Sequence, residues 1–263
     1  MSGSLDLRSF KIPLGKLAPQ ESFRTRQGDV LSYRLYPAWS EDLIILYHGV
    51  GSDSRYMCVL ASALAAAGLG TVVTPDFRGH GISLPLSDKI KPAQLEIDLE
   101  ELIIHLRMQR AVSRITLAGH SLGGGFVLRV AVSDIRTQFA NFVALAPHLP
   151  LSFHSFQEGF GGWISLTEEG GFRVNMPENF RSGQEKLSYS PEFLAAVQAP
   201  EDLVARLQSL RPALKVLTGT DEEVARPEVH RQIFTEAGVP VEILPGLNHL
   251  TLVSKPDAVV SRF

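Results

Sequence analysis

Residues 115–124 read ITLAGHSLGG, an apolar run followed by Gly119-His120-Ser121-Leu122-Gly123 and one further glycine. The apolar run predicts a buried strand, and the residues from Leu122 onward predict a helix. A Gly-x-Ser-x-Gly motif between a strand and a helix is typical of a nucleophilic serine whose hydroxyl projects above the sheet. Side chains at positions 119 and 123 would crowd the close approach of strand and helix, so glycine is expected at both. A simple Gly-Ser turn is the alternative interpretation.

A nucleophilic serine needs a general base and a carboxylate that orients the base. In a strand–turn–helix arrangement of this kind the three residues follow the order serine, acid, histidine. Asp221 stands just beyond a predicted buried strand, and His249 lies in the loop after the next strand. We therefore expect Ser121, Asp221 and His249 to form a catalytic triad. Glu222 and Glu223, in the same loop as Asp221, are the alternatives for the acid.

Two backbone N–H groups are candidates for stabilising negative charge on a substrate oxygen. The N–H of Leu122 lies at the start of the predicted helix, where backbone donors are unpaired and the helix dipole is positive. Val50 lies between two glycines in His48-Gly49-Val50-Gly51, directly after the apolar run that ends at Tyr47. We expect Leu122 and Val50 to form the oxyanion hole. We expect His48 to tie this loop by hydrogen bonds.

The rest of the chain alternates between predicted buried strands and predicted helices, which favours an α/β fold with a parallel sheet covered on both faces. Residues 21–36 predict an antiparallel hairpin around Gln27-Gly28-Asp29. The predicted strands are 43–47, 71–73, 115–118, 142–145, 214–217 and 241–244, and the predicted helices are 55–67, 94–108, one from 122, 227–238 and one from about 256.

The alternation stops between residues 148 and 199, which we interpret as an insertion into the core formed by residues 1–147 and 200–263. The insertion is rich in aromatic residues and predicts a hairpin of 163–166 against 172–174. Four of the aromatic residues are expected to line an apolar substrate pocket. They are Phe153, Phe156, Phe160 and Trp163. Alternatively, these rings anchor the insertion to the core.

Composition excludes several classes of function. Lys and Arg number 25 against 28 Asp and Glu, with no basic block, so no nucleic-acid partner is expected. The single cysteine, Cys58, excludes an internal disulfide. No cluster has the spacing of metal ligands or of a phosphate-binding loop, so no cofactor and no metal are expected. No signal peptide and no membrane span are expected, which favours a cytoplasmic location. The oligomeric state is left open.

The motifs around Ser121 and Val50, with Asp221, His249 and Asp76-Phe77-Arg78-Gly79-His80-Gly81, resemble the α/β-hydrolase family over nearly the whole chain. The His-Gly and Arg-Gly-His-Gly elements are similar to the monoacylglycerol lipase, lysophospholipase and serine aminopeptidase-like branch. The resemblance implies a mostly parallel sheet of about eight strands, with a small cap after the sixth strand at 148–199. We expect the Asp-Phe-Arg-Gly-His-Gly segment to brace the neighbouring loops.

The resemblance also implies a carboxylic ester hydrolase with a Ser-His-Asp acyl-enzyme mechanism. The expected substrates are small molecules: short- to medium-chain acyl or aryl monoesters, including monoacylglycerol-like or lysophospholipid-like esters. Two other functions use the same fold and triad, namely hydrolysis of a carbon–carbon bond and service as a ligand receptor or scaffold.

Overall fold

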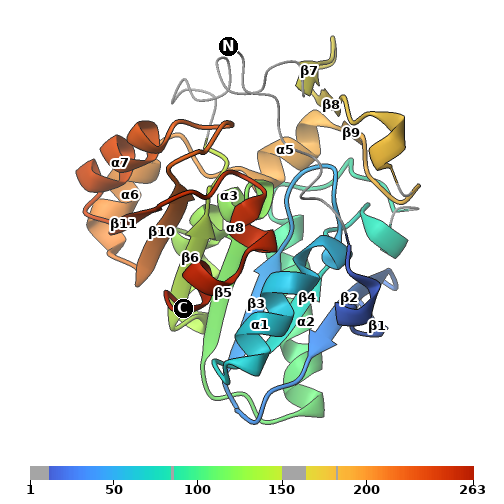
Figure 1. The fold of residues 1–263 in the computed structure, drawn as a ribbon. Coiled ribbons are helices and arrows are strands. Elements are labelled where there is room, and N and C mark those ends of the chain that lie inside the picture. Colours follow the sequence, from blue (N-terminus) through green and yellow to red (C-terminus); the bar gives the residue numbers. More distant parts are fainter. Residues whose placement is uncertain (1–11, 84–85, 150–163, 182) are drawn as a thin grey trace.

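A computed structural model describes residues 12–83, 86–149, 164–181 and 183–263 of the chain. Its centre is an eight-stranded sheet with the strand order β1-β2-β4-β3-β5-β6-β10-β11 (Figure 1). The strands are β1 (Gln20–Arg24), β2 (Val30–Tyr36), β3 (Leu43–Tyr47), β4 (Thr71–Pro75), β5 (Ile115–His120), β6 (Asn141–Leu145), β10 (Leu214–Gly219) and β11 (Val241–Leu244). Only β2 runs antiparallel to its neighbours β1 and β4. The expected mostly parallel sheet of about eight strands is confirmed.

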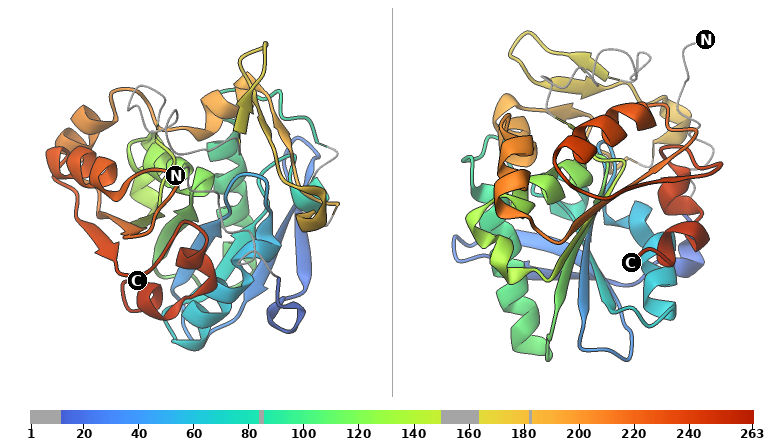
Figure 2. Two further views of the ribbon diagram at one scale, coloured as in Figure 1. Left: turned by 45° about the horizontal axis from the view of Figure 1, so that its top comes forward. Right: turned by 90° about the vertical axis from the view of Figure 1, so that its left-hand side faces the viewer.

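Helices cover both faces of this sheet, as the edge-on view in Figure 2 shows. One face carries α1 (Cys58–Ala66), α8 (Thr251–Ser254) and α9 (Asp257–Val260), and the other carries α2 (Gln94–Gln109), α3 (Leu122–Ala131), α6 (Leu203–Leu210) and α7 (Pro227–Glu236). Short 3-10 helices are η2 (Leu14–Lys16), η3 (Ser54–Met57), η4 (Gly81–Ser83), η5 (Asp134–Gln138) and η7 (Glu178–Phe180). All residues of β3 and β4 are buried, which explains the unbroken apolar run of β3, whereas β4 also buries Thr71 and Thr74.

A second sheet of three short strands follows β6. It contains β7 (Ile164–Leu166), β8 (Phe172–Val174) and β9 (Ser188–Tyr189), and it precedes α5 (Pro191–Val197). The β7–β8 hairpin agrees with the sequence prediction, whereas β9, α5 and α6 were not predicted. Phe172 and Phe193 are almost fully buried in the main apolar core. The small sheet is therefore packed onto the rest of the protein.

The loops that could form a site gather at one edge of the large sheet. In the parallel register Tyr47 at the end of β3 lies beside Gly119, and His120 at the end of β5 lies beside Leu145. Parallel neighbours thus end together, and the loops after β3, β5, β6, β10 and β11 lie at the same edge, where open α/β sheets bind ligands. Of the helices in the described ranges, none has the length and apolar character to cross a bilayer.

Candidate active site

Ser121 occupies a sharp turn between β5 and α3. Its backbone has φ 54° and ψ −114°, a conformation that L-residues with a side chain rarely adopt. The surroundings hold this conformation: the Ser121 N–H donates to the Leu145 carbonyl at 2.9 Å, and the Ser121 carbonyl accepts from the N–H groups of His148 and Gly125 at 2.8 and 2.9 Å. A strained serine fixed on three sides is the backbone geometry that the motif predicts.

Glycine is sterically required on both sides of Ser121. A Cβ atom at Gly119 would lie 2.3 Å from the Gly123 carbonyl oxygen, and one at Gly123 would lie 2.6 Å from the Tyr47 carbonyl oxygen. Both distances are far below van der Waals contact. The motif therefore has the steric cause expected from the sequence, namely that β5, α3 and the end of β3 touch at this turn.

His249 is held at three points. Its Nδ1 lies 2.9 and 3.0 Å from the two carboxylate oxygens of Glu222. Its main-chain N–H donates to Glu223 Oε2 at 3.0 Å, and its carbonyl accepts from His120 Nε2 at 2.8 Å. Since His120 directly precedes Ser121, the last contact joins the histidine loop to the serine turn. The His120 and His249 rings lie 4.6 Å apart between centroids.

The charges around His249 favour its protonated form. Burial lowers the pKa of His249, but the charge and hydrogen bond of Glu222 and the charge of Glu223 raise it further, so the pKa lies above 6.5. Burial raises the pKa of Glu222, yet the neighbouring His249 lowers it below its usual value. Burial also lowers the pKa of His120 to about 3, so its imidazole is neutral and donates its single Nε2 proton to the His249 carbonyl. His249 therefore donates its Nδ1 proton to the buried carboxylate of Glu222, and this contact fixes the orientation of the imidazole ring.

The expected pairing of Asp221 with His249 is wrong. Asp221 is exposed, and its carboxylate accepts a hydrogen bond from Thr220 Oγ1 at 2.9 Å. β10 runs two residues beyond the predicted end, to Gly219, and the Asp221 N–H donates to the Leu247 carbonyl. This extended path turns the Asp221 side chain outward and the next side chain, Glu222, inward. Glu222 is one of the two alternatives that the sequence offers, but three consecutive acids carry no signal of which one faces the histidine.

The loop after β3 lies directly against Ser121. A Cβ atom at Gly49 would be 3.2 Å from the Ser121 Cβ atom, a tight contact that glycine avoids. The next residue is Val50, and Leu122, which directly follows Ser121 in the chain, is the first residue of α3. Within the described ranges, neither the Val50 N–H nor the Leu122 N–H makes a hydrogen bond. Two free backbone donors therefore flank the serine.

The direction of the Val50 N–H is fixed through the carbonyl of the same peptide group, that of Gly49. This carbonyl accepts from Ser52 Oγ at 2.8 Å and lies 2.9 Å from His48 Nδ1. His48 Nε2 accepts from the Phe77 N–H at 3.2 Å, and burial lowers the pKa of His48, so the neutral ring carries its proton on Nδ1 and donates it to Gly49. As expected, His48 ties the loop by hydrogen bonds.

The Asp-Phe-Arg-Gly-His-Gly segment after β4 braces neighbouring elements. Asp76 accepts from Ser32 Oγ at 2.6 Å and from the Ser54 N–H at 2.7 Å, which joins β2 and η3 to the end of β4. Arg78 forms a two-pronged ion pair with Asp98 of α2, at 2.7 and 2.9 Å, and a second pair with Asp29. The segment therefore has the bracing role expected for it.

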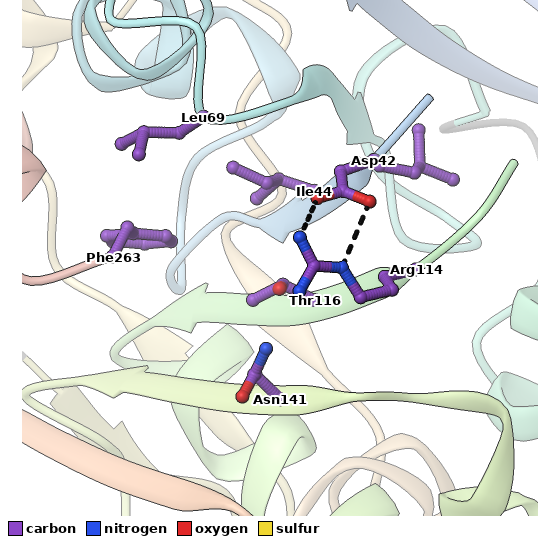
Figure 3. A pocket seen from close by; sticks show the side chains of 8 residues that line it. Asp42, Ile44, Leu69, Arg114, Thr116, Asn141 and Phe263 are labelled. Carbon is purple, nitrogen blue, oxygen red and sulfur yellow. Dashed lines mark hydrogen bonds and ion pairs between the residues drawn. The ribbon is translucent and has the colours of Figure 1, made fainter. Parts of the chain in front are cut away.

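Four predicted pocket residues cannot be placed. Phe153, Phe156, Phe160 and Trp163 lie outside the described residues. A cavity of about 200 Å³ lies instead at the opposite edge of the sheet, where β3, β5 and β6 begin, next to the ion pair of Arg114 and Asp42 (Figure 3). It is far from the loops around Ser121 and is not part of this site. The described part of the chain contains no group of three His, Cys, Asp or Glu side chains that could hold a metal ion.

A sheet of this order, with a strained serine after its fifth strand and a histidine–carboxylate pair after the last two, defines a class of hydrolytic folds. Residues 43–262 match the sequence profile of the Alpha/beta hydrolase family, and the chain belongs to this family. Among curated proteins, an uncharacterized protein of Mycobacterium tuberculosis is 32% identical over 120 residues, covering 45% of this chain and 33% of its own. The match thus spans about a third of that relative.

Solved structures share the fold over almost the whole chain. Est1E from Butyrivibrio proteoclasticus superposes with a TM-score of 0.64 at 15% identity, covering 94% of this chain and 97% of its own. The esterase domain of a Rhodothermus marinus protein gives 0.63 at 19%, covering 92% and 93%. A monoglyceride lipase from Saccharomyces cerevisiae gives 0.65 at 14%, covering 90% and 89%. At these identities the likeness concerns the fold, and the family supports hydrolysis as the general activity.

Proposed function

We propose that this protein is a serine hydrolase of carboxylic esters, with Ser121 as nucleophile, His249 as general base and Glu222 as the orienting acid. The observation that carries the proposal is the buried His249–Glu222 pair, tied through His120 to a serine in a strained turn. The three residues then have distinct roles: Glu222 fixes the Nδ1–H tautomer, His249 presents Nε2 as a base, and Ser121 supplies the attacking oxygen.

In the proposed reaction Ser121 Oγ attacks the ester carbonyl carbon while its proton passes to His249 Nε2. The substrate carbonyl becomes an oxyanion that accepts hydrogen bonds from the Val50 and Leu122 N–H groups. The C–O bond to the alcohol then breaks, and the alcohol leaves with the proton from His249. Water then gives a proton to His249 and attacks the acyl carbon, and the bond to Ser121 Oγ breaks as His249 passes the proton to that oxygen, which releases the carboxylic acid.

We infer short- to medium-chain acyl or aryl monoesters as the substrate class. The segment 148–199 follows β6, and its small sheet contacts the loop after β3, because Val174 and Met176 lie within 3.5 Å of a Cβ position at Gly51. A small segment over the site favours small esters, and we propose that it acts as a cap. Two fold relatives are consistent with this range, Est1E with ferulic acid bound and the monoglyceride lipase with a substrate analog.

The test is hydrolysis of p-nitrophenyl esters from two to twelve acyl carbons by the parent protein and by Ser121→Ala. Ser133→Ala is the matched control, since Ser133 lies beyond the other end of α3 and donates only to the Val130 carbonyl. The proposal expects turnover by the parent and the control and none above background by Ser121→Ala. Absence of Ser121-dependent ester turnover at every chain length would refute the proposal. Turnover of a substrate with a cleavable carbon–carbon bond would then favour a carbon–carbon bond hydrolase, and no turnover at all would favour a ligand receptor or scaffold.

A further inference from the structure

The small sheet contributes one polar contact to the loop beside Ser121. The N–H of Gly51 donates to the hydroxyl oxygen of Tyr189, in β9, at 2.8 Å. The two residues are 138 positions apart in the chain, and both are buried. This contact joins a segment that follows β6 to the residue directly after Val50.

The Tyr189 hydroxyl has a second partner that fixes its orientation. His80 Nε2 lies 2.9 Å from it, while His80 Nδ1 lies 3.2 Å from the Arg78 carbonyl oxygen, which can only accept. Burial lowers the pKa of His80 well below 6.5, so the ring is neutral and its proton is on Nδ1. The Tyr189 hydroxyl therefore donates to His80 Nε2 and keeps its oxygen lone pairs available for the Gly51 N–H.

The ring of Tyr189 has little freedom to move away from this position. It is 2% exposed and stacks on Phe172 with centroids 4.5 Å apart. The rings of His80 and Phe193 lie 5.4 and 5.5 Å from it. A buried ring held by aromatic contacts places its hydroxyl accurately without losing further side-chain entropy on each turnover.

Val50 lies between two peptide groups, and each is held by side chains from elsewhere in the chain or the loop. The first contains the Val50 N–H and is held through the Gly49 carbonyl by Ser52 and His48. The second contains the Gly51 N–H and is held by Tyr189. Gly51 has φ +65°, so the backbone at this position would not resist rotation by itself. Loss of the Tyr189 hydroxyl would therefore let the Val50–Gly51 peptide group rotate, and with it the neighbouring N–H of Val50 could shift.

We propose that Tyr189 is a positioning residue for the oxyanion hole, acting through Gly51 on the N–H of Val50. The inference rests on the proposed function, since it concerns the same site. It also gives the small sheet a role in transition-state stabilisation, because a displacement of β9 would displace the donor. An oxyanion donor acts only when its distance to the developing charge is right, so its misplacement lowers kcat more than it raises KM.

The test compares Tyr189→Phe with Tyr33→Phe. Tyr33 is an equally buried tyrosine whose hydroxyl bonds Glu21 and His105, and β2, which carries it, is separated from β5 by β4 and β3. Each variant loses one hydroxyl and the hydrogen bonds to its two partners, so both are expected to lose thermal stability. Only Tyr189→Phe is expected to lower kcat, by about 10- to 100-fold at unchanged KM.

A second readout does not depend on the choice of ester. A fluorophosphonate probe phosphonylates a nucleophilic serine: the Ser121 Oγ–P bond forms, the P–F bond breaks, and the serine proton leaves through His249 with fluoride. Its phosphonyl oxygen uses the same oxyanion hole, so Tyr189→Phe should slow labelling of Ser121 by a factor similar to the fall in kcat. If Tyr189→Phe does not fold, His80→Phe, which removes the acceptor of the hydroxyl and the donor to the Arg78 carbonyl but keeps the Tyr189–Gly51 contact, should slow labelling to a smaller extent.

The outcomes separate the two proposals. Equal kcat losses in Tyr189→Phe and Tyr33→Phe, or unchanged labelling by the probe, would overturn the role of Tyr189 and leave the esterase proposal intact. Ser121-dependent labelling without turnover of any ester would overturn the esterase proposal, and the labelling rates would still decide the role of Tyr189. Absence of labelling at Ser121 in the parent would overturn both.

Discussion

Replacing Glu222 by glutamine tests which carboxylate orients His249. The Glu222 side chain is fully buried, and its Oε1 also accepts the Val224 N–H at 2.8 Å. In Glu222→Gln the amide oxygen remains on this backbone donor, so the NH₂ group takes the Oε2 position, 3.0 Å from His249 Nδ1. An amide NH₂ can only donate there, so it opposes the Nδ1–H that the amide oxygen, 2.9 Å from Nδ1, would accept. The negative charge that stabilises the protonated His249 during proton transfer is lost in either arrangement.

We expect kcat/KM of Glu222→Gln to fall by about 10³- to 10⁴-fold, as for other triads in which the acid is replaced by its amide. This corresponds to a loss of about 4–5.5 kcal/mol of transition-state stabilisation. The matched control is Asp221→Asn, one residue earlier, whose exposed carboxylate bonds only Thr220; its activity should be unchanged. The assay is p-nitrophenyl butyrate hydrolysis with active-site titration. A large loss in Asp221→Asn together with an active Glu222→Gln would refute the assignment.

Three further perturbations have predictable results. The pKa of His249 is raised, and only its neutral form accepts the serine proton, so kcat/KM should fall tenfold per pH unit below a midpoint that lies above 6.5; a midpoint below 6.5 in the pH profile would contradict this. Gly123→Ala places a Cβ 2.6 Å from a backbone oxygen and should lower kcat about 100-fold, whereas Gly15→Ala, with no atom within 4 Å, should be fully active in the same assay. Arg78→Met leaves the buried Asp98 with the Gln94 hydrogen bond but without its ion-pair partner, and should lower the free energy of unfolding by about 3–5 kcal/mol in urea titration. A loss smaller than about 1 kcal/mol would show that the pair is not needed.

The sequence predicted the fold well because the signals were local. The run in β3 is apolar on both faces, as a strand covered on both sides requires, and Gly119 is required by the Gly123 carbonyl within the same turn. The short elements β9 and α5 were missed since their burial depends on partners far away in the chain. Ser188–Tyr189, for example, forms a strand only because β8 lies beside it.

The choice of acid was missed for a related reason. Which of three consecutive acids faces a histidine depends on how far β10 continues before it turns, and that length is set by pairing with β11 and by the contact of Gly219 with Leu247. A Cβ at Gly219 would lie 1.8 Å from the Leu247 carbonyl oxygen, so the loop that carries His249 packs directly on this strand end. No local pattern in the sequence encodes that contact.

The histidines that hold the site in place have lowered pKa values, whereas the pKa of the expected base, His249, is raised. Burial keeps the pKa of several of them below 6.5, namely His48, His80, His120, His148 and His230. The hydrogen bonds from His120 to the His249 carbonyl and from His48 to the Gly49 carbonyl therefore keep the same protonation state throughout the neutral pH range. His249 differs, because two carboxylates outweigh its burial. The acid limb of the pH profile should consequently follow one proton, with a slope of one, and a steeper limb would mean that the ties break together with the protonation of the base.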